Sequence, residues 1–415
     1  MEEWKEYKIE KLGSYITDIA AGPFGSNLKV ECFVSQGFPI IDGANLKEFK
    51  VTDNVTKFVT EEKARSLHRS IAKRNDVVVT ISGNVGQISY IPMNSKYEEY
   101  LVSQRQFRVT FDTNKVYVPY LVYYFHTIEG QHKILSFANQ TGVPALTQPL
   151  KNFRNIDIAL PSLSKQVRIA TALNALDDKI ENNRRINENL EQQAQALFKS
   201  WFVDFEPFKD GEFVESELGM IPKGWRVESL SSIADYINGL AMQKFRPNDG
   251  EIGLPVLKIK ELGQGICDGN SELCSPSLIG DKYIINDGDI IFSWSGTLMV
   301  KVWCGGKCGL NQHLFVVIPN KYPKWFVYQW TKNHLDNFIR IAKDKAVTMG
   351  HIKRGELDKA KVVIPNNEQF AKMDTLMTPI FDEIIKREIE SRRLAELRDT
   401  LLPKLMSGEL KLNEN

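Results

Sequence analysis

A long polar helix in the middle of the chain decides the architecture. The stretch Asp177–Phe198, DDKIENNRRINENLEQQAQALF, contains no Gly or Pro and consists mostly of good helix formers. Residues at alternating steps of three and four form a heptad seam through it and on both sides of it. The seam runs through Ile169, Leu173, Leu176, Ile180, Asn183, Asn187, Leu190, Ala194, Leu197 and Trp201. Two asparagines therefore lie where a coiled coil normally buries apolar side chains.

The same seam returns 204 residues later, with Ile384 matching Ile180 and Leu394 matching Leu190. It runs through Met373, Met377, Ile380, Ile384, Arg387, Ser391, Leu394, Arg398, Leu401 and Leu405. Both seams turn polar at the same place. If a local two-fold axis relates the copies, the helices pack antiparallel and the two polar stretches face and hydrogen-bond each other, which also sets their register. The alternative is a wet middle where the helices splay apart.

The globular parts are repeated as well. WKEYKIEKLGSYI from Trp4 matches WRVESLSSIADYI from Trp225, and SQRQFRV matches NQHLFVV, with Gln104 on Gln312. VVVTIS and DIIFSWS read as buried strands. The stretch 206–225 is rich in Pro and Gly without a period and is interpreted as a linker. The sequence thus predicts an α/β protein with two tandem pseudo-repeated globular domains and two long helices packed as an antiparallel coiled coil.

Bulk properties narrow the class of protein. The hydrophobic content of 42% is enough for real cores, and the net charge of +1 gives no general attraction to nucleic acid, so any such binding must rest on local patches. There is no apolar run of transmembrane or signal-peptide length, from which we expect a soluble intracellular protein. The five cysteines are irregularly spaced, which favours reduced thiols over disulfides.

Several stretches resemble the specificity subunit of type I restriction-modification systems, and the resemblance covers essentially the whole chain. They are LPSLSKQVRIATALNALDDKIENN (160–183), its repeat IPNNEQFAKMDTLMTPIFDEII (364–385), ALFKSWFVDFEPF (196–208), ELGMIPKGW (217–225) and LRDTLLPKLMSGEL (397–410). The helices and the linker are the specific part. The second repeat departs slightly, with Gln369 where the first has Lys165.

The resemblance implies a non-catalytic, cytoplasmic DNA-reading subunit that serves DNA methylation and defence against foreign DNA. Each target-recognition domain would read one half of a bipartite, asymmetric site, and the helices would set the spacing and dock two methyltransferase subunits. Those subunits would use S-adenosylmethionine, and restriction subunits would add ATP- and Mg-dependent translocation and cleavage; no cofactor is expected in this chain. The implied divisions are target-recognition domains at 1–160 and 225–364, helices at 161–206 and 365–410, and a linker at 207–224.

Candidate DNA-binding residues are Arg, Lys, Asn, Gln, His and small polar residues in loops that recur in both copies. In the first copy they are Ser26, Asn27, Lys29, Arg65, Arg69, Lys73, Arg74, Asn84, Gln87, Gln104 and Arg105. In the second they are Lys244, Arg246, Ser295, Thr297, Lys301, Gln312, His313, Lys345, Lys353 and Arg354. Because the side chains differ between copies, the two domains should read different sequences. A plain tight turn at 22–29 and a solvated helix face at 63–74 are the alternatives.

The aromatic stretch at the end of the first helix has two interpretations. By resemblance, Phe198, Trp201, Phe202 and Phe205 would contact a modification subunit. The alternative is that they pack in the core of a globular domain.

Motifs for chemistry in this chain are weak. There is no NPPY or DPPY tetrapeptide, CGGKCG (304–309) lacks the phosphate-loop spacing, and the spacing of Cys267, Cys274, Cys304 and Cys308 suits a zinc site poorly. Two rival functions remain: a self-sufficient DNA nuclease or methyltransferase with an unrecognised active site, and a structural coiled-coil adaptor that does not touch DNA.

Overall fold

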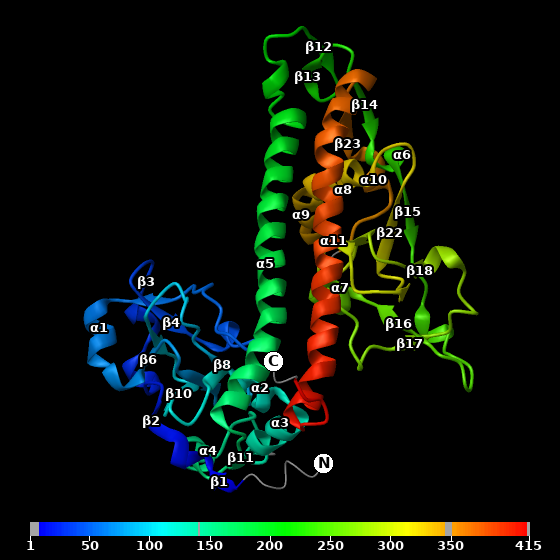
Figure 1. Ribbon diagram of the computed structural model, residues 1–415. Helices are drawn as coiled ribbons and strands as arrows, with labels where there is room; N and C mark the ends of the chain where they lie inside the picture. Colours follow the sequence, from blue (N-terminus) through cyan, green and yellow to red (C-terminus); the bar gives the residue numbers. More distant parts are fainter. Residues whose placement is uncertain (1–7, 140–141, 345–350, 413–415) are drawn as a thin grey trace. The chain divides into compact units, whose positions relative to one another are not determined.

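The computed structural model describes residues 8–139, 142–344 and 351–412 (Figure 1). It divides into two compact units. The first consists of Met1–Asp177 with Glu396–Asn415, and the second of Asp178–Ala395. Each unit combines a globular α/β part with segments of both long helices, α5 (Leu163–Phe202) and α11 (Asn367–Met406).

The described residues of the first unit form short strands, four short α-helices and several single 3-10 turns. Its strands are β1 (Ile9–Lys11), β2 (Ile16–Ala21), β3 (Phe33–Val34), β4 (Phe38–Ile41), β5 (Phe58–Val59), β6 (Ile71–Lys73), β7 (Val77–Thr80), β8 (Ile88–Tyr90), β9 (Glu99–Val102), β10 (Gln106–Phe111) and β11 (Asp157–Ala159). Its helices are α1 (Glu61–Ser66), α2 (Val118–His126), α3 (Ile128–Leu135) and α4 (Pro149–Arg154).

Three sheets organise the first unit. An antiparallel sheet has the order β2-β10-β7-β8, a mixed sheet has the order β3-β5-β4-β9-β6 with β4 and β9 parallel, and β1 pairs with β11. The four residues of β7 are all buried, which explains their unbroken β-branched run. Helix α2, whose apolar residues are buried, joins Leu173 and Leu405 in the core of this unit.

The second unit repeats this plan. Its strands are β12 (Phe213–Ser216), β13 (Gly219–Pro222), β14 (Arg226–Ser229), β15 (Ala234–Asn238), β16 (Leu254–Leu257), β17 (Leu273–Cys274), β18 (Ile284–Ile285), β19 (Asp289–Ser293), β20 (Met299–Trp303), β21 (Cys308–Leu310), β22 (Leu314–Pro319) and β23 (Lys361–Ile364). Its helices are α6 (Leu230–Ile233), α7 (Ile259–Gln264), α8 (Lys324–Asn333), α9 (Leu335–Asp344) and α10 (Gly355–Lys359).

The strand orders of the two units correspond. The antiparallel sheet β15-β22-β19-β20 matches β2-β10-β7-β8, the parallel pair β16 and β21 matches β4 and β9, and β14 pairs with β23 as β1 does with β11. Phe315 lies opposite Phe292 in one sheet as Phe107 lies opposite Val79 in the other. The predicted α/β fold of two repeated domains is therefore confirmed.

The stretch interpreted as a linker contains regular structure. Strands β12 and β13 form a hairpin in which Phe213 lies opposite Pro222, and the turn is closed by a hydrogen bond from Leu218 N to Ser216 Oγ. Gly219 takes a φ of 89°, a value that favours glycine. Strands of four residues are too short to show a clear alternation of apolar and polar residues, so the sequence did not indicate this hairpin. The domain boundaries drawn from the sequence remain a prediction.

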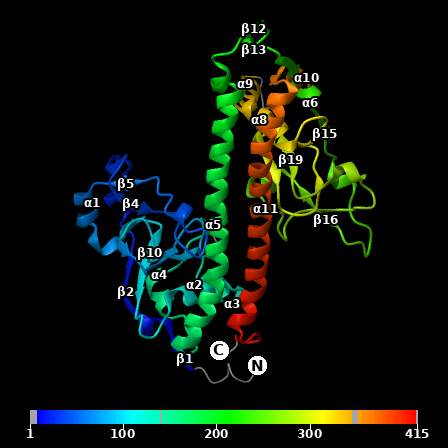
Figure 2. The same cartoon turned by 45° about the horizontal axis from the view of Figure 1, so that its top comes forward.

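The long helices pair antiparallel within each unit, and both views show α5 and α11 side by side (Figures 1 and 2). In the first unit, Arg398 Nη1 lies 2.7 Å from Asp177 Oδ1. In the second unit, Asn183 Nδ2 donates to Ser391 Oγ at 3.3 Å and Asn187 Nδ2 donates to the Ile384 carbonyl at 3.1 Å. Residue numbers that rise along α5 meet numbers that fall along α11, as an antiparallel pair requires.

The polar stretch of the seam is dry rather than wet. Asn183 is 0% exposed and Asn187 is 6% exposed. Asn183 also donates to Glu390 Oε2 at 2.8 Å and accepts from Arg387 Nη1 at 3.1 Å. Two buried atoms of this layer, Asn187 Oδ1 and Arg387 Nε, have no hydrogen-bond partner among the described residues. These two atoms make the layer less stable than an apolar layer would be, while the hydrogen bonds of Asn183 favour this register over others.

Replacing Asn183 by alanine is expected to lower the free energy of unfolding of the second unit by about 1 to 3 kcal/mol, because groups on α11 lose buried hydrogen bonds. Urea unfolding followed by tryptophan fluorescence measures the change. Exposed Asn182, next to it on α5, serves as the matched alanine control. Equal stability of the two variants would show that the layer contributes nothing.

Candidate nucleic-acid interface

Three turns of the first unit meet at one edge of the antiparallel sheet, where β2 and β7 end and β10 begins. They are 22–27, 81–87 and 103–105, and together we call them the first turn cluster. Gly22 N donates to the Gln106 carbonyl at 2.8 Å, and Ile81 N donates to the Arg105 carbonyl at 2.7 Å. A Cβ on Gly22 would lie 1.9 Å from the Ser103 carbonyl oxygen, so only glycine permits this approach.

The first turn cluster presents polar side chains to solvent. Ser26, Asn27, Asn84, Gln104 and Arg105 are all exposed. Gln87, also predicted, is half-buried, and its Oε1 accepts from Thr80 Oγ1 at 3.3 Å. The sheet edge therefore gathers base-reading side-chain types from three separate segments at one surface.

The second unit has an equivalent surface, the second turn cluster, made of 238–240, 294–297 and 311–313. Gly239 N donates to the Leu314 carbonyl at 3.0 Å, and Gln312 N donates to the Leu240 carbonyl at 2.8 Å. A Cβ on Gly239 would lie 2.3 Å from the Asn311 carbonyl oxygen. Gly239 is thus the structural equivalent of Gly22.

The side chains on the second turn cluster differ from those on the first. Half-buried Trp294 donates from Nε1 to Asn238 Oδ1 at 2.9 Å, and its ring centre lies 6.1 Å from that of His313 and 6.3 Å from that of His351. Sequence reasoning missed Trp294, Asn238 and His351. The available signal was an indole directly before Ser295-Gly296, the pair that matches Ser82-Gly83 in the first copy.

Ser295 is one prediction that the structure corrects. Its side chain is 5% exposed and lies 3.1 Å from His313 Nδ1, so it positions the histidine instead of facing a ligand. Thr297 is exposed, and Gln312 and His313 are half-buried at the turn.

The basic stretch of the first unit is largely neutralised by carboxylates. Arg65 pairs with Glu61 at 2.8 Å, Lys73 with Glu99 at 3.4 Å, and Arg74 with Glu98 at 3.4 Å. Arg65 also pairs with Glu99; burial tends to raise the pKa of that carboxyl, but the two cations hold it below its ordinary value. The solvated-face alternative therefore describes these three cations better than a free DNA-binding patch.

Arg69, within the basic stretch, and Lys29, outside it, differ from the three paired cations. Both side chains are exposed. Ser70 Oγ donates to the Ala21 carbonyl at 3.0 Å, which places Arg69 beside the end of β2 and hence beside the first turn cluster. Arg69 is thus the cation of the basic stretch best placed to meet a phosphate there.

The predicted cations of the second unit are only partly available. Arg246 lies 3.7 Å from Glu272, Lys301 Nζ donates to the Gly263 carbonyl at 2.8 Å, and Arg354 Nη2 donates to the Tyr236 carbonyl at 2.9 Å. Lys244 and Lys353 are exposed. Lys345 lies outside the described residues.

The aromatic residues at the end of α5 pack in the core of the second unit, so the predicted subunit contact is wrong for the buried rings. Phe198, Trp201 and Phe202 are 5%, 8% and 2% exposed, and the Phe198 and Trp330 ring centres lie 5.1 Å apart. Phe205 is half-buried, 5.6 Å from Trp225. These rings pack in the core of their own chain, which was the alternative interpretation drawn from the sequence.

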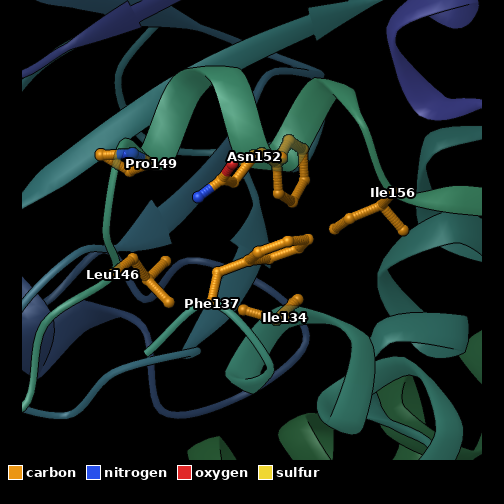
Figure 3. A pocket seen from close by; sticks show the side chains of 7 residues that line it. Ile134, Phe137, Leu146, Pro149, Asn152 and Ile156 are labelled. Atoms are coloured by element: carbon orange, nitrogen blue, oxygen red, sulfur yellow. The ribbon is translucent and has the colours of Figure 1, made fainter. Parts of the chain in front are cut away.

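The described residues contain no group of three or more His, Cys, Asp or Glu side chains placed to hold a metal ion, and all five cysteines are free thiols. A small hollow between α3 and α4 is lined by Ile134, Phe137, Leu146 and other mainly apolar side chains (Figure 3). Its polar member, Asn152, donates to the Thr147 carbonyl at 2.6 Å.

Within the described ranges, no helix combines the length and the apolar character that crossing a membrane requires.

Two copies of one α/β domain, each with a polar turn cluster at the same sheet edge, define a duplicated binding protein. The chain belongs to the family described as type I restriction modification DNA specificity domain, which matches residues 1–192 and 222–398. The chain is thus a type I specificity subunit, a non-catalytic protein with DNA-recognition domains, and these predictions are confirmed. Nothing in the comparisons supports the rival nuclease or methyltransferase.

Relatives span the whole chain at low identity. The type I restriction enzyme MjaIX specificity subunit of Methanocaldococcus jannaschii is 27% identical and is aligned over 100% of this chain and 95% of its own length. The HindI specificity subunit of Haemophilus influenzae is 22% identical and is aligned over 99% of this chain and 100% of its own length. The crystal structure of a type I restriction-modification S subunit from M. genitalium shares the fold, with a TM-score of 0.56, 14% identity and 96% of both chains covered.

Proposed function

We propose that each turn cluster reads one half of a bipartite, asymmetric site on double-stranded DNA. The observation that carries this proposal is the equivalence of the two clusters: the backbone of Gly22 and of Gly239 makes the same close approach, while the side chains around them differ. One scaffold with two sets of side chains gives two different half-sites.

The side chains suit the reading of base edges in the major groove. Arg105 can pair with O6 and N7 of guanine, and Gln104 and Gln312 can pair with N6 and N7 of adenine. The His313 ring lies between Ser295 Oγ, 3.1 Å from Nδ1, and Gln312 Nε2, 3.3 Å from Nε2, so it would orient the Gln312 amide for base reading. Lys29 and Arg69 would contact phosphates, which position the domain without specifying sequence.

The long helices would set the distance between the half-sites and dock two modification subunits. Each helix has 40 residues, about 60 Å at 1.5 Å per residue. Most of the exposed positions are polar, and Val167, Leu376 and Leu397 are exposed apolar residues on them. The modification subunits would use S-adenosylmethionine, and restriction subunits would use ATP and Mg, all in the cytoplasm. This chain itself would hold no cofactor.

Sequencing of methylated bases in host DNA, with and without this gene, tests the proposal. We expect a motif of two unlike half-sites separated by an unspecified gap, present only with the gene. A mobility shift with DNA carrying that motif should weaken steeply as salt rises, because phosphate contacts release counterions. An unchanged methylation pattern, or a motif with two identical halves, would contradict the proposal.

Arg105→Ala and Gln312→Ala are expected to relax specificity in one half-site each. Losing a bidentate contact should reduce discrimination at one base pair by about 1 to 3 kcal/mol. Competition binding with DNA in which either half-site is altered base by base measures the effect, and each variant is the control for the other. Equal losses in both half-sites would argue against one domain per half-site.

A further inference from the structure

Phe24 is the one exposed aromatic ring among the Phe, Trp and Tyr side chains that the structure describes. It is 82% exposed, whereas every other such ring is buried or half-buried. A single exposed apolar residue is ordinary on a protein surface. Where all the other described aromatic rings are at least half-buried, however, a ring this exposed suggests a surface outside the chain that covers it.

The loop that carries Phe24 holds the ring in a defined place. On the N-terminal side of Phe24, the Gly22 N–H donates a hydrogen bond to the Gln106 carbonyl, and Gly22 lies close to the Ser103 carbonyl oxygen. On the other, Asn27 N donates to the Phe24 carbonyl at 2.8 Å and closes a tight turn. Between them, a Cβ on Gly25 would lie 2.7 Å from Gln104 Oε1, so the turn rests on a predicted base-reading side chain.

We propose that Phe24 inserts as an apolar wedge between two stacked base pairs of the half-site read by the first unit. This inference rests on the proposed function. Base faces and thymine methyl groups are the apolar surfaces that DNA offers, and only a base face can cover a whole ring. Phenylalanine is among the side chains that proteins insert between base steps. The exposed groups around Phe24, namely Ser26, Asn27 and Gln104, are hydrogen-bonding groups suited to base edges and phosphates. An apolar protein surface on this ring would have to desolvate them.

The wedge belongs to one half-site only. Since Gly239 takes the place of Gly22, the residue equivalent to Phe24 is Ala241, which is half-buried. Alanine is too small to separate a base step. The distortion of the DNA is therefore confined to the half-site of the first unit, which makes the second half-site an internal control.

The experiment uses the full chain together with its modification subunits and duplexes that carry the methylated motif. 2-Aminopurine, which fluoresces more strongly when unstacked, replaces one base at a time across both half-sites. The variants are Phe24→Ala, Phe24→Leu and, as a matched control, Met93→Ala. Met93 is also an exposed apolar residue of the first unit, at 69%, but it follows β8, whose Tyr90 pairs with Val77 at the end of β7 remote from the turn cluster.

With the wild-type protein we expect fluorescence to rise at one step of the first half-site. Phe24→Ala should abolish the rise and weaken binding by about 5- to 100-fold, the effect of losing a ring stacked on bases. Phe24→Leu should keep part of both effects, and Met93→Ala should match wild type. All variants should melt at the wild-type temperature, because the replaced side chains are exposed.

Two results would overturn the wedge and leave the proposed function standing: DNA binding by wild type with no rise in the first half-site, or Phe24→Ala that binds and fluoresces as wild type does. The second result is also what we expect if a protein partner, and not DNA, covers the Phe24 ring. Wild-type protein that fails to bind the methylated motif at all would instead overturn the proposed function.

Discussion

Arg398→Ala is expected to lower the free energy of unfolding of the first unit by about 3 to 5 kcal/mol, because it leaves a buried carboxylate without its cation. The side chains of Arg398 and Asp177 are each 12% exposed. Tyr123 donates a hydrogen bond to the same carboxylate, and the Arg398 guanidinium lies 4.7 Å from the centre of the Phe49 ring. Burial and the Asp177 charge together raise the pKa of Tyr123, so its hydroxyl stays a donor.

The duplicated sequence supplies a rescue for this variant. At the offset of 204, Asp177 corresponds to Phe381 and Ala194 corresponds to Arg398, and both Phe381 and Ala194 are buried in the core of the second unit. The double variant Asp177→Phe, Arg398→Ala copies that apolar pair into the first unit. We expect it to recover most of the lost stability, since replacing a buried ion pair by apolar side chains of matching volume is often neutral.

The two units can be followed separately. Six of the seven tryptophans, Trp201 and those after it, belong to the second unit, so their fluorescence monitors that unit. Hydrogen exchange of β7 and β10 reports on the first. Lys404→Ala, an exposed change on the same helix, is the control. Unaltered exchange in Arg398→Ala, or a double variant no better than the single one, would refute the buried pair as a source of stability.

Gly22→Ala is expected to weaken binding to the first half-site by roughly 10- to 100-fold, because the added methyl group displaces the turn that presents Gln104 and Arg105. The Cβ would lie 1.9 Å from the Ser103 carbonyl oxygen, which is backbone and cannot rotate away. The strain should also cost about 1 to 3 kcal/mol of stability in the first unit.

Gly239→Ala is the mirror experiment, since its Cβ would lie 2.3 Å from the Leu310 and Asn311 carbonyl oxygens of the second turn cluster. Gly269→Ala is the control, because a Cβ there meets no atom within 4 Å. Binding to duplexes with one half-site scrambled separates the effects. If either glycine variant weakened binding to both half-sites equally, or to neither, the result would contradict the proposal that each turn cluster recognises one half-site.

The candidate site was only partly predictable from the sequence. The internal repeat aligns Gln104 with Gln312, and both residues lie on equivalent turns of their units. The pairing of Lys73 and Arg74 with Glu99 and Glu98 could not be predicted, because those carboxylates come from a distant segment of the chain. Trp294 and Phe24 were missed because their significance depends on exposure and on neighbours from other segments.

The sequence by itself determined the duplication and the place of the polar layer in each helix, because repeats and heptad spacing can be recognised along the chain. It predicted antiparallel helices once a two-fold relation between the copies was assumed. Only the tertiary structure decided that Asn183 is dry, that Phe198 and Phe202 are core residues, and that Ser295 faces inward while Phe24 faces solvent. Burial and charge neutralisation depend on which distant segments meet, and no spacing along the chain records that.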